Sequence, residues 1–198
     1  MLSENRKKFE KVSEKFGEFF SKTGISPNTF TLISLLFALF SLIFLIKRNL
    51  ILTALFFLFA ALLDLIDGAV AKFTNSVTQK GAYLDTIFDR YVEGIILLGF
   101  LFLPLPKIYL DAKLWIFLSL FGSFMTTYAK AAGKEKDILK EELKKGLLER
   151  PERLFLIFLS LILGIFNFSW MIYLIIFLAI FSNFTAVQRI YIIIFQIG

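Results

Sequence analysis

The stretch "DLIDGAVAKFTNSVTQKGAYLDTIFDR", residues 64–90, holds four aspartates in a chain that is otherwise strongly apolar. Asp64 and Asp67 are three residues apart, and Asp85 and Asp89 are four apart, so on a helix each pair lies on one face. The polar segment between the two pairs has the composition of a turn. The stretch therefore predicts a helical hairpin whose two arms direct four carboxylates into one space.

The composition around this stretch predicts a membrane protein. Of the 198 residues, 58% are hydrophobic and 26 are phenylalanine, which is more apolar surface than a soluble domain of this length can bury. A membrane span needs roughly 20 mostly apolar residues. We expect an all-α, polytopic membrane protein with six transmembrane helices at residues 28–47, 49–73, 82–104, 112–131, 152–167 and 169–192.

The N-terminal residues 1–22 have the pattern of an amphipathic helix. Phe9, Phe16 and Phe20 recur at helical spacing, with several lysines elsewhere around the helix. This pattern is typical of a helix that lies in the membrane interface, although a solvated helix packed on another protein shows it too. We therefore expect an interfacial helix over 1–22, followed by a single six-helix membrane domain over 23–198.

The basic residues are distributed unevenly around a net charge of +6. They are concentrated before the first expected span and between the fourth and the fifth. The positive-inside rule therefore predicts a multi-pass protein of the cell membrane with both termini in the cytoplasm. The four aspartates lie on the same side. The expected partners of the basic residues are anionic membrane lipids and phosphorylated substrates, and no nucleic acid.

The aspartates are candidate metal ligands. The chain has no cysteine and no histidine, which excludes disulfides, zinc fingers, haem ligation by histidine and Ser/His/Asp catalysis. Carboxylates alone indicate Mg²⁺ or Mn²⁺, and four of them indicate two ions about 3.5–4 Å apart, an arrangement that suits phosphoryl chemistry. Gly68 and Gly81 leave room for a substrate to approach closely. The alternative is that the acids are ordinary helix-end charges paired with Lys72, Lys80 and Arg90.

The same stretch resembles the signature of the CDP-alcohol phosphotransferases, D-x2-D-G-x2-A-R-x8-G-x3-D-x3-D. Every spacing matches, and a single residue type departs, because Lys72 replaces the arginine. Lysine keeps the positive charge but loses the planar fork that binds phosphate bidentately. The matching residues are Asp64, Asp67, Gly68, Ala71, Gly81, Asp85 and Asp89.

The resemblance implies a reaction and a site. The donor would be a CDP-linked lipid, either diacylglycerol-based or archaeol-based, and an acceptor alcohol would attack the β-phosphorus and release CMP. Asp64, Asp67 and Asp85 would bind the metals, and Asp89 would complete the second metal site and act as general base. The family is commonly homodimeric. The residues expected at the CDP-lipid are Gly68, Ala71, Lys72, Gly81, Asn28 and Thr31.

Three arginines suggest the acceptor. Arg150 and Arg153 flank a helix start, and Arg189 lies inside an apolar span, where a cation needs an anionic partner. A phosphate on the acceptor would provide one. The segments "GLLERPERL" (146–154) and "TAVQRIY" (185–191) resemble the inositol-phosphate-accepting branch, the phosphatidylinositol phosphate and archaetidylinositol phosphate synthases. We therefore expect inositol 1-phosphate as the acceptor, with Lys130 and Lys144 contributing to its site.

Several alternatives remain open from the sequence. The same enzyme could use glycerol 3-phosphate or serine. Arg189 could pair with an acid of a neighbouring helix, such as Glu93. A divalent-cation transporter would need acids spread along a path through the membrane, whereas these are clustered. A membrane prenyltransferase would need a second aspartate-rich motif, and none follows Asp89.

Overall fold

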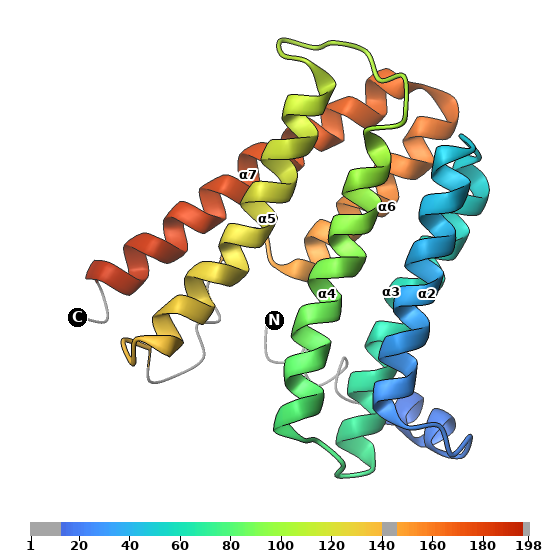
Figure 1. Ribbon diagram of the computed structural model, residues 1–198, viewed down its shortest axis with the longest axis vertical. Coiled ribbons are helices and arrows are strands. Elements are labelled where there is room, and N and C mark those ends of the chain that lie inside the picture. Colours follow the sequence, from blue (N-terminus) through green and yellow to red (C-terminus); the bar gives the residue numbers. More distant parts are fainter. Residues whose placement is uncertain (1–12, 140–145, 196–198) are drawn as a thin grey trace. The chain divides into compact units, whose positions relative to one another are not determined.

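The computed structural model describes residues 13–139 and 146–195, and these are helical almost throughout (Figure 1). Within them there is no β-strand, so the all-α prediction is confirmed. The ends of the six long helices agree with the predicted spans to within a few residues. A short helix over residues 13–21 precedes α2 (Pro27–Ile46), α3 (Leu50–Phe73), α4 (Gln79–Phe100), α5 (Ala112–Glu135), α6 (Arg150–Phe166) and α7 (Phe168–Phe195).

Local polar side chains determine where the helices begin. At the start of α2, the Ser26 hydroxyl accepts a hydrogen bond from the backbone N–H of Thr29 (3.3 Å), and Pro27 occupies the first helical position. At the start of α4, the Thr78 hydroxyl accepts one from the N–H of Gly81 (3.0 Å). The second cap matters for the site, because it fixes where the helix bearing Asp85 begins.

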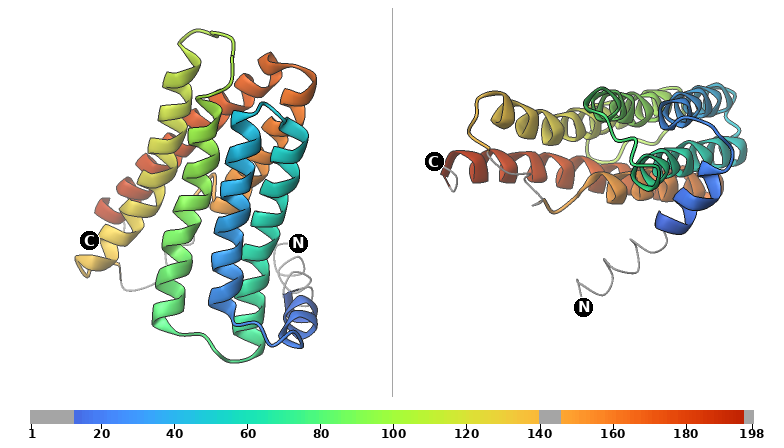
Figure 2. Two further views of the ribbon diagram at one scale, coloured as in Figure 1. Left: turned by 45° about the vertical axis from the view of Figure 1, so that its right-hand side comes forward. Right: turned by 90° about the horizontal axis from the view of Figure 1, so that it is seen from below.

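The first of two compact units comprises residues 13–44 and 55–96. In it, α2 and α3 lie side by side, as both Figure 1 and Figure 2 show. The core of this unit contains an apolar cluster of Phe30, Ile66 and Val70, with Phe20 and Leu63 packed against it. The cluster joins the short N-terminal helix to α2 and α3.

The second unit comprises residues 45–54 and, within the described part, 97–195. Here α7 packs against both α5 and α6. The Asn183 amide donates to the Leu118 carbonyl (2.8 Å), and the Ser119 hydroxyl donates to the Ile175 carbonyl (3.1 Å). Small and polar residues at such an interface let helix backbones approach closely, as is usual between helices in a membrane.

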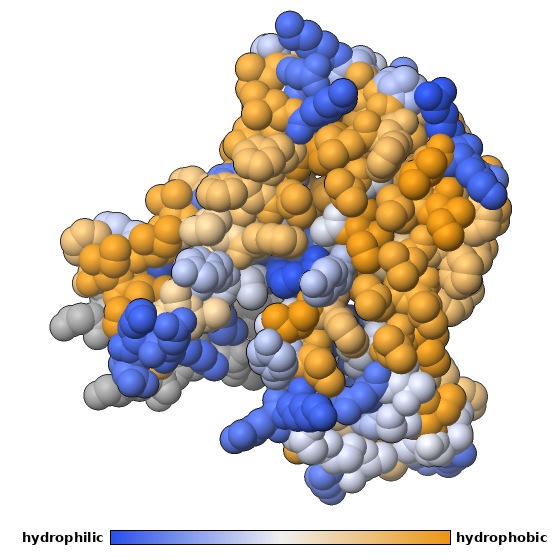
Figure 3. Space-filling model, in the orientation of Figure 1, coloured by the Kyte–Doolittle hydropathy of each residue, from blue (hydrophilic) through white to orange (hydrophobic). Residues whose placement is uncertain are grey.

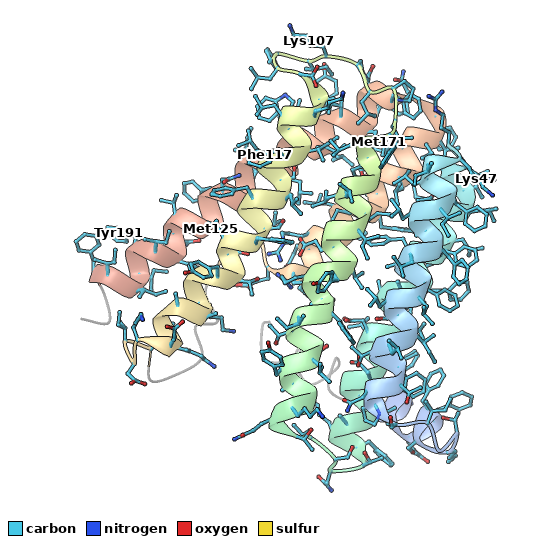
Figure 4. The ribbon with its side chains drawn as sticks, viewed as in Figure 1. Lys47, Lys107, Phe117, Met125, Met171 and Tyr191 are labelled. Carbon is cyan, nitrogen blue, oxygen red and sulfur yellow. The ribbon has the colours of Figure 1, made fainter. Side chains whose placement is uncertain are left out.

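The surface agrees with a membrane protein. Among the described helices, α2, α3 and α7 are long and apolar enough to cross a membrane. Phe117 on α5 and Tyr191 on α7 point outward and are each 56% exposed (Figure 4). In Figure 3, apolar side chains cover much of α2, whereas hydrophilic ones gather at the turn between α3 and α4. The other three expected spans are less clear, because α6 has 17 residues and α4 carries charged residues along its length.

The packing of α5 against α7 gives a prediction for stability. A Cβ atom added at Gly122 would lie 2.7 Å from the backbone nitrogen of Asn183. We expect Gly122→Val to lower the unfolding temperature in detergent by several degrees, since overpacking costs about 1–3 kcal/mol. The control is Phe121→Val, because Phe121 is 50% exposed. Equal melting of the two variants would contradict the close approach.

Candidate active site

Three of the four aspartates meet in the first unit. Asp64, Asp67 and Asp85 each place a carboxylate oxygen within 4.8 Å of the other two. Asp64 and Asp67 are 8% and 4% exposed, and they lie on successive turns of α3, whereas Asp85 is on α4. The predicted helical hairpin is therefore present, and it directs carboxylates from both arms into one space.

Helix α2 also contacts the acidic cluster that these three carboxylates form. The Thr31 hydroxyl on α2 donates a 2.6 Å hydrogen bond to Asp67 Oδ2, and both residues are buried. A bond of this length to an ionised carboxylate is a strong one. Thr31 was expected beside the CDP-lipid. Its observed contact gives it a second role, which is to fix the orientation of Asp67.

Asp89 lies one turn beyond Asp85 on α4 and is not one of the three clustered carboxylates. Its carboxylate is 3.7 Å from the Arg90 guanidinium, which is also 3.5 Å from Glu93. Glu93 is fully buried. Sequence reasoning treated Arg90 as an alternative partner for the acids and gave Glu93 no place beside Asp89. The one-turn spacing from Asp89 to Glu93 was the signal that could have revealed this group.

A pocket of about 270 Å³ opens beside the acidic cluster. It contains all six residues that the resemblance assigned to the CDP-lipid, together with two of the aspartates. Ser76, Val77 and Thr78 also line it, and sequence reasoning missed them although they lie in the polar turn between the two acid pairs. The full lining is Pro27, Asn28, Thr31, Asp67, Gly68, Ala71, Lys72, Ser76, Val77, Thr78, Gly81, Ala82 and Asp85.

The two glycines of the pocket differ in their surroundings. A Cβ atom at Gly68 would meet no atom within 4 Å, so the missing side chain leaves open space in the pocket. A Cβ atom at Gly81 would lie 3.0 Å from the Thr78 hydroxyl and 3.1 Å from the Asn28 side-chain oxygen. Gly68 thus leaves room for a ligand, whereas Gly81 allows close packing of the protein itself.

The arginines expected at the acceptor lie in the second unit, where two of them share Thr126 of α5. Arg153 is 1% exposed and donates to the Thr126 hydroxyl (3.2 Å). Arg189 is 5% exposed and donates to the Thr126 carbonyl (2.6 Å). Arg189 also pairs with Glu149 at 2.5 Å. Its acidic partner is therefore Glu149, which precedes α6, and not the Glu93 considered from the sequence.

The backbone just before α6 is held on α7. The N–H of Leu148 donates to the Thr185 hydroxyl (3.1 Å), and Arg153 donates to the Leu148 carbonyl (3.3 Å). A Cβ atom at Gly146 would lie 2.6 Å from Glu149 Oε1, so this segment fits closely. Lys130 and Arg150 are half-buried in the same unit, and Lys144 lies outside the described residues.

The donor set of the acidic cluster fits a hard divalent cation. The three carboxylates are crowded and largely buried, and carboxylates in that position repel one another unless positive charge lies between them. Oxygen ligands without nitrogen or sulfur suit Mg²⁺ and Mn²⁺. The fold and this site define a helical membrane protein with a candidate divalent-metal centre beside a ligand pocket.

Comparison with known proteins identifies the family. The model of the CDP-alcohol phosphatidyltransferases matches residues 24–187, and the chain belongs to this family of transferases. An archaetidylinositol phosphate synthase of Pyrococcus horikoshii is 32% identical over 193 residues, which cover 96% of this chain and 95% of that protein. A protein of Aquifex aeolicus named bifunctional IPC transferase and DIPP synthase is 34% identical over 67% of this chain, but over only 31% of its own length.

Solved structures share the fold. The phosphatidylinositol phosphate synthase of Mycobacterium tuberculosis, in a crystal structure with CDP-DAG bound, superposes with a TM-score of 0.78 at 24% identity. The match covers 92% of this chain and 94% of that one. Another crystal structure of the same protein is a complex with manganese and citrate.

The acidic cluster gives a prediction for metal binding. We expect the purified protein to bind Mn²⁺, and Asp67→Asn to weaken binding by more than about 10–100-fold, the range for losing groups that only support a ligand. Titration followed by electron paramagnetic resonance measures this without substrate. The control is Asp137→Asn, since Asp137 is exposed and far from the cluster in sequence. Equal Mn²⁺ affinity in the two variants would contradict a metal site at Asp67.

Proposed function

We propose that the protein transfers a phosphatidyl or archaetidyl group from a CDP-linked lipid to inositol 1-phosphate and releases CMP. The observation that carries this proposal is the acidic cluster beside the 270 Å³ pocket, in a chain of the CDP-alcohol phosphatidyltransferase family. The choice of acceptor is supported by the names of the Pyrococcus and Mycobacterium proteins and by the buried arginines of the second unit.

The proposed roles in the first unit follow from position. Asp64, Asp67 and Asp85 would bind the metals, and Asp89 would complete the second metal site. The two cations would stabilise the negative charge that develops on the diphosphate. Lys72, which is exposed and lines the pocket, supplies further positive charge to the donor. Gly68, Ala71, Gly81, Asn28 and Thr31 line the donor site.

Asp89 is the proposed general base. It takes the proton from the acceptor hydroxyl, whose oxygen forms a bond to the β-phosphorus of the donor. The bond from that phosphorus to the bridging oxygen breaks, and CMP leaves with the electron pair. Arg90 lies beside Asp89, 3.7 Å from its carboxylate, and restrains it.

In the second unit, Arg189, Arg150 and Lys130 provide the proposed acceptor site, to which Lys144, outside the described residues, is also assigned. Arg153 adds positive charge from a buried position, where it donates hydrogen bonds to the Thr126 hydroxyl and the Leu148 carbonyl. A phosphorylated acceptor accounts for such a concentration of cations, whereas serine has no phosphate for them to bind.

We also propose the topology predicted from the sequence. All six long helices cross the membrane, both termini and the site face the cytoplasm, and the protein is a homodimer. The helix over 13–21 lies in the membrane interface, which is supported by the exposure of Phe16 (45%) and Phe19 (67%) beside Lys15 and Lys22.

The direct test is a transferase assay of the purified protein in detergent. CDP-diacylglycerol and CDP-archaeol are each offered with inositol 1-phosphate, glycerol 3-phosphate, serine or free inositol, and CMP release is measured. We expect the highest kcat/KM with inositol 1-phosphate. Preference for serine or free inositol would overturn the acceptor, and the absence of CMP release with every pair would overturn the reaction. Metal uptake into proteoliposomes tests the transporter alternative.

Asp89→Asn tests the base. We expect kcat to fall by about 10²–10⁴-fold or more, because the change removes proton abstraction together with a metal contact. The KM for the CDP-lipid should change much less. The matched control is Asp111→Asn, which retains the ability to cap α5. Near-normal turnover of the Asp89 variant would reject the assignment.

Arg189→Ala tests the acceptor site. We expect the KM for inositol 1-phosphate to rise by an order of magnitude or more, on the scale of a lost charged hydrogen bond of about 1.5–3 kcal/mol, with the KM for the CDP-lipid nearly unchanged. The control is Arg48→Ala, since Arg48 is exposed. A folded Arg189 variant with an unchanged acceptor KM would make the pairing with Glu149 purely structural.

A further inference from the structure

We propose that the helix over residues 13–21 is a brace for the metal-binding carboxylate Asp67, and that Gly17 and Phe20 are its positioning residues. The inference rests on the proposed function only in assigning a metal to Asp67. It gives the N-terminal helix a part in the site that is separate from its contact with the membrane.

Gly17 brings the backbone of this helix directly against α3. A Cβ atom there would lie 2.6 Å from the carbonyl oxygen of Ala69 and 2.8 Å from the Cβ of Phe73. Any side chain at this position would push the two helices apart. Ala69 is two residues after Asp67, so the contact is made on the same turn of α3 that carries the carboxylate and opens onto the pocket at Gly68.

Phe20 packs against residues that directly precede Thr31 and Asp67 in the sequence. Its ring makes an edge contact with Phe30, with the ring centroids 6.0 Å apart, and it packs against the cluster that includes Ile66 and Val70. Phe30 precedes Thr31, and Ile66 precedes Asp67. The backbone on each side of the 2.6 Å bond between Thr31 and Asp67 is therefore held by one apolar cluster, to which Phe20 belongs.

The geometry has a physical consequence. A hydrogen bond between α2 and α3 keeps its length only while the two backbones keep their separation, and a well-packed core transmits small displacements of a neighbour. Removal of the Phe20 ring leaves a cavity beneath Phe30 and Ile66 that the surroundings fill only in part. The resulting shift acts on Asp67 through Thr31, so the metal ligand loses its orientation although its own residue is intact.

The adjacent phenylalanine provides a matched control. Phe19 is on the same helix and of the same type, and its ring contacts that of Phe20 (centroids 5.1 Å apart), but it is 67% exposed and does not itself belong to the cluster. Phe20→Ala and Phe19→Ala therefore remove the same atoms from the same helix, and they differ in the contact with the site.

The experiment measures Mn²⁺ affinity by electron paramagnetic resonance on the full chain in detergent. We expect Phe20→Ala to weaken binding by about tenfold, the lower end of the range for groups that support a metal ligand, and Gly17→Leu to do the same. Phe19→Ala should stay within about twofold of the wild type, because Phe20 keeps its own packing against the cluster. Phe20→Leu, which keeps most of the packing, should restore most of the affinity.

A general loss of stability is separated from loss of the brace by Ile175→Ala. Ile175 is buried in the second unit, so this variant lowers the unfolding temperature without touching the cluster around Phe20. If Phe20→Ala is poorly folded, the comparison of Gly17→Ala with Ile175→Ala replaces it, since a Cβ atom at Gly17 would lie 2.6 Å from the Ala69 carbonyl oxygen. The brace predicts lower Mn²⁺ affinity in Phe20→Ala or Gly17→Ala, and unchanged Mn²⁺ affinity in Ile175→Ala.

The possible results are distinct. Equal Mn²⁺ affinity in the Phe20, Phe19 and wild-type proteins overturns the brace and leaves the proposed function standing. A wild type that binds Mn²⁺ but transfers no lipid group overturns the function, and the brace is then supported if the Phe20 variant still binds more weakly. A wild type that binds no Mn²⁺ overturns the brace, since there is no metal ligand to position.

Discussion

The main constraint on the site is that several carboxylates lie close together within a strongly apolar chain. Asp64, Asp67 and Asp85 bring carboxylate oxygens within 4.8 Å of one another, and two of the three residues are almost fully buried. Such carboxylates repel each other and lose hydration, which is costly in a membrane protein. Neighbouring residues offset part of this free-energy cost. Thr31 donates a hydrogen bond to Asp67. The pocket beside the cluster is open at Gly68, so cations, or ligands bound to cations, have room there.

The hairpin could be predicted because it depends on residues that are close together in the sequence. The spacing of Asp64 from Asp67, and of Asp85 from Asp89, fixes helix faces, and the turn between them has a polar composition. The positions of the long helices followed from apolar length alone. The start of α2 at Ser26 and Pro27 is local in the same way, since capping depends on a few adjacent residues. The six residues expected at the CDP-lipid came instead from the resemblance, and all of them line one pocket in the structure.

Other features could not be predicted, because their partners are distant in the sequence. Arg189 meets Glu149 forty residues away and the Thr126 carbonyl 63 residues away. A backbone carbonyl has no sequence signature at all. Asp89 also departs from the simplest expectation, since one helical turn carries it beyond the other three carboxylates and beside Arg90. Spacing predicts which residues share a face of a helix, but not which of them meet a neighbouring helix.

The charge of the acidic cluster also bears on the acceptor. Carboxylates that repel one another also repel a diphosphate, so the proposed donor depends on neutralisation of Asp64, Asp67 and Asp85 by cations. A phosphorylated acceptor would meet the same repulsion, and it requires basic residues of its own. Free inositol or serine would carry no net negative charge and would need none. Glu149 already gives Arg189 one anionic partner, and an anionic acceptor suits the remaining positive charge of Arg153 and its neighbours better than a neutral one does.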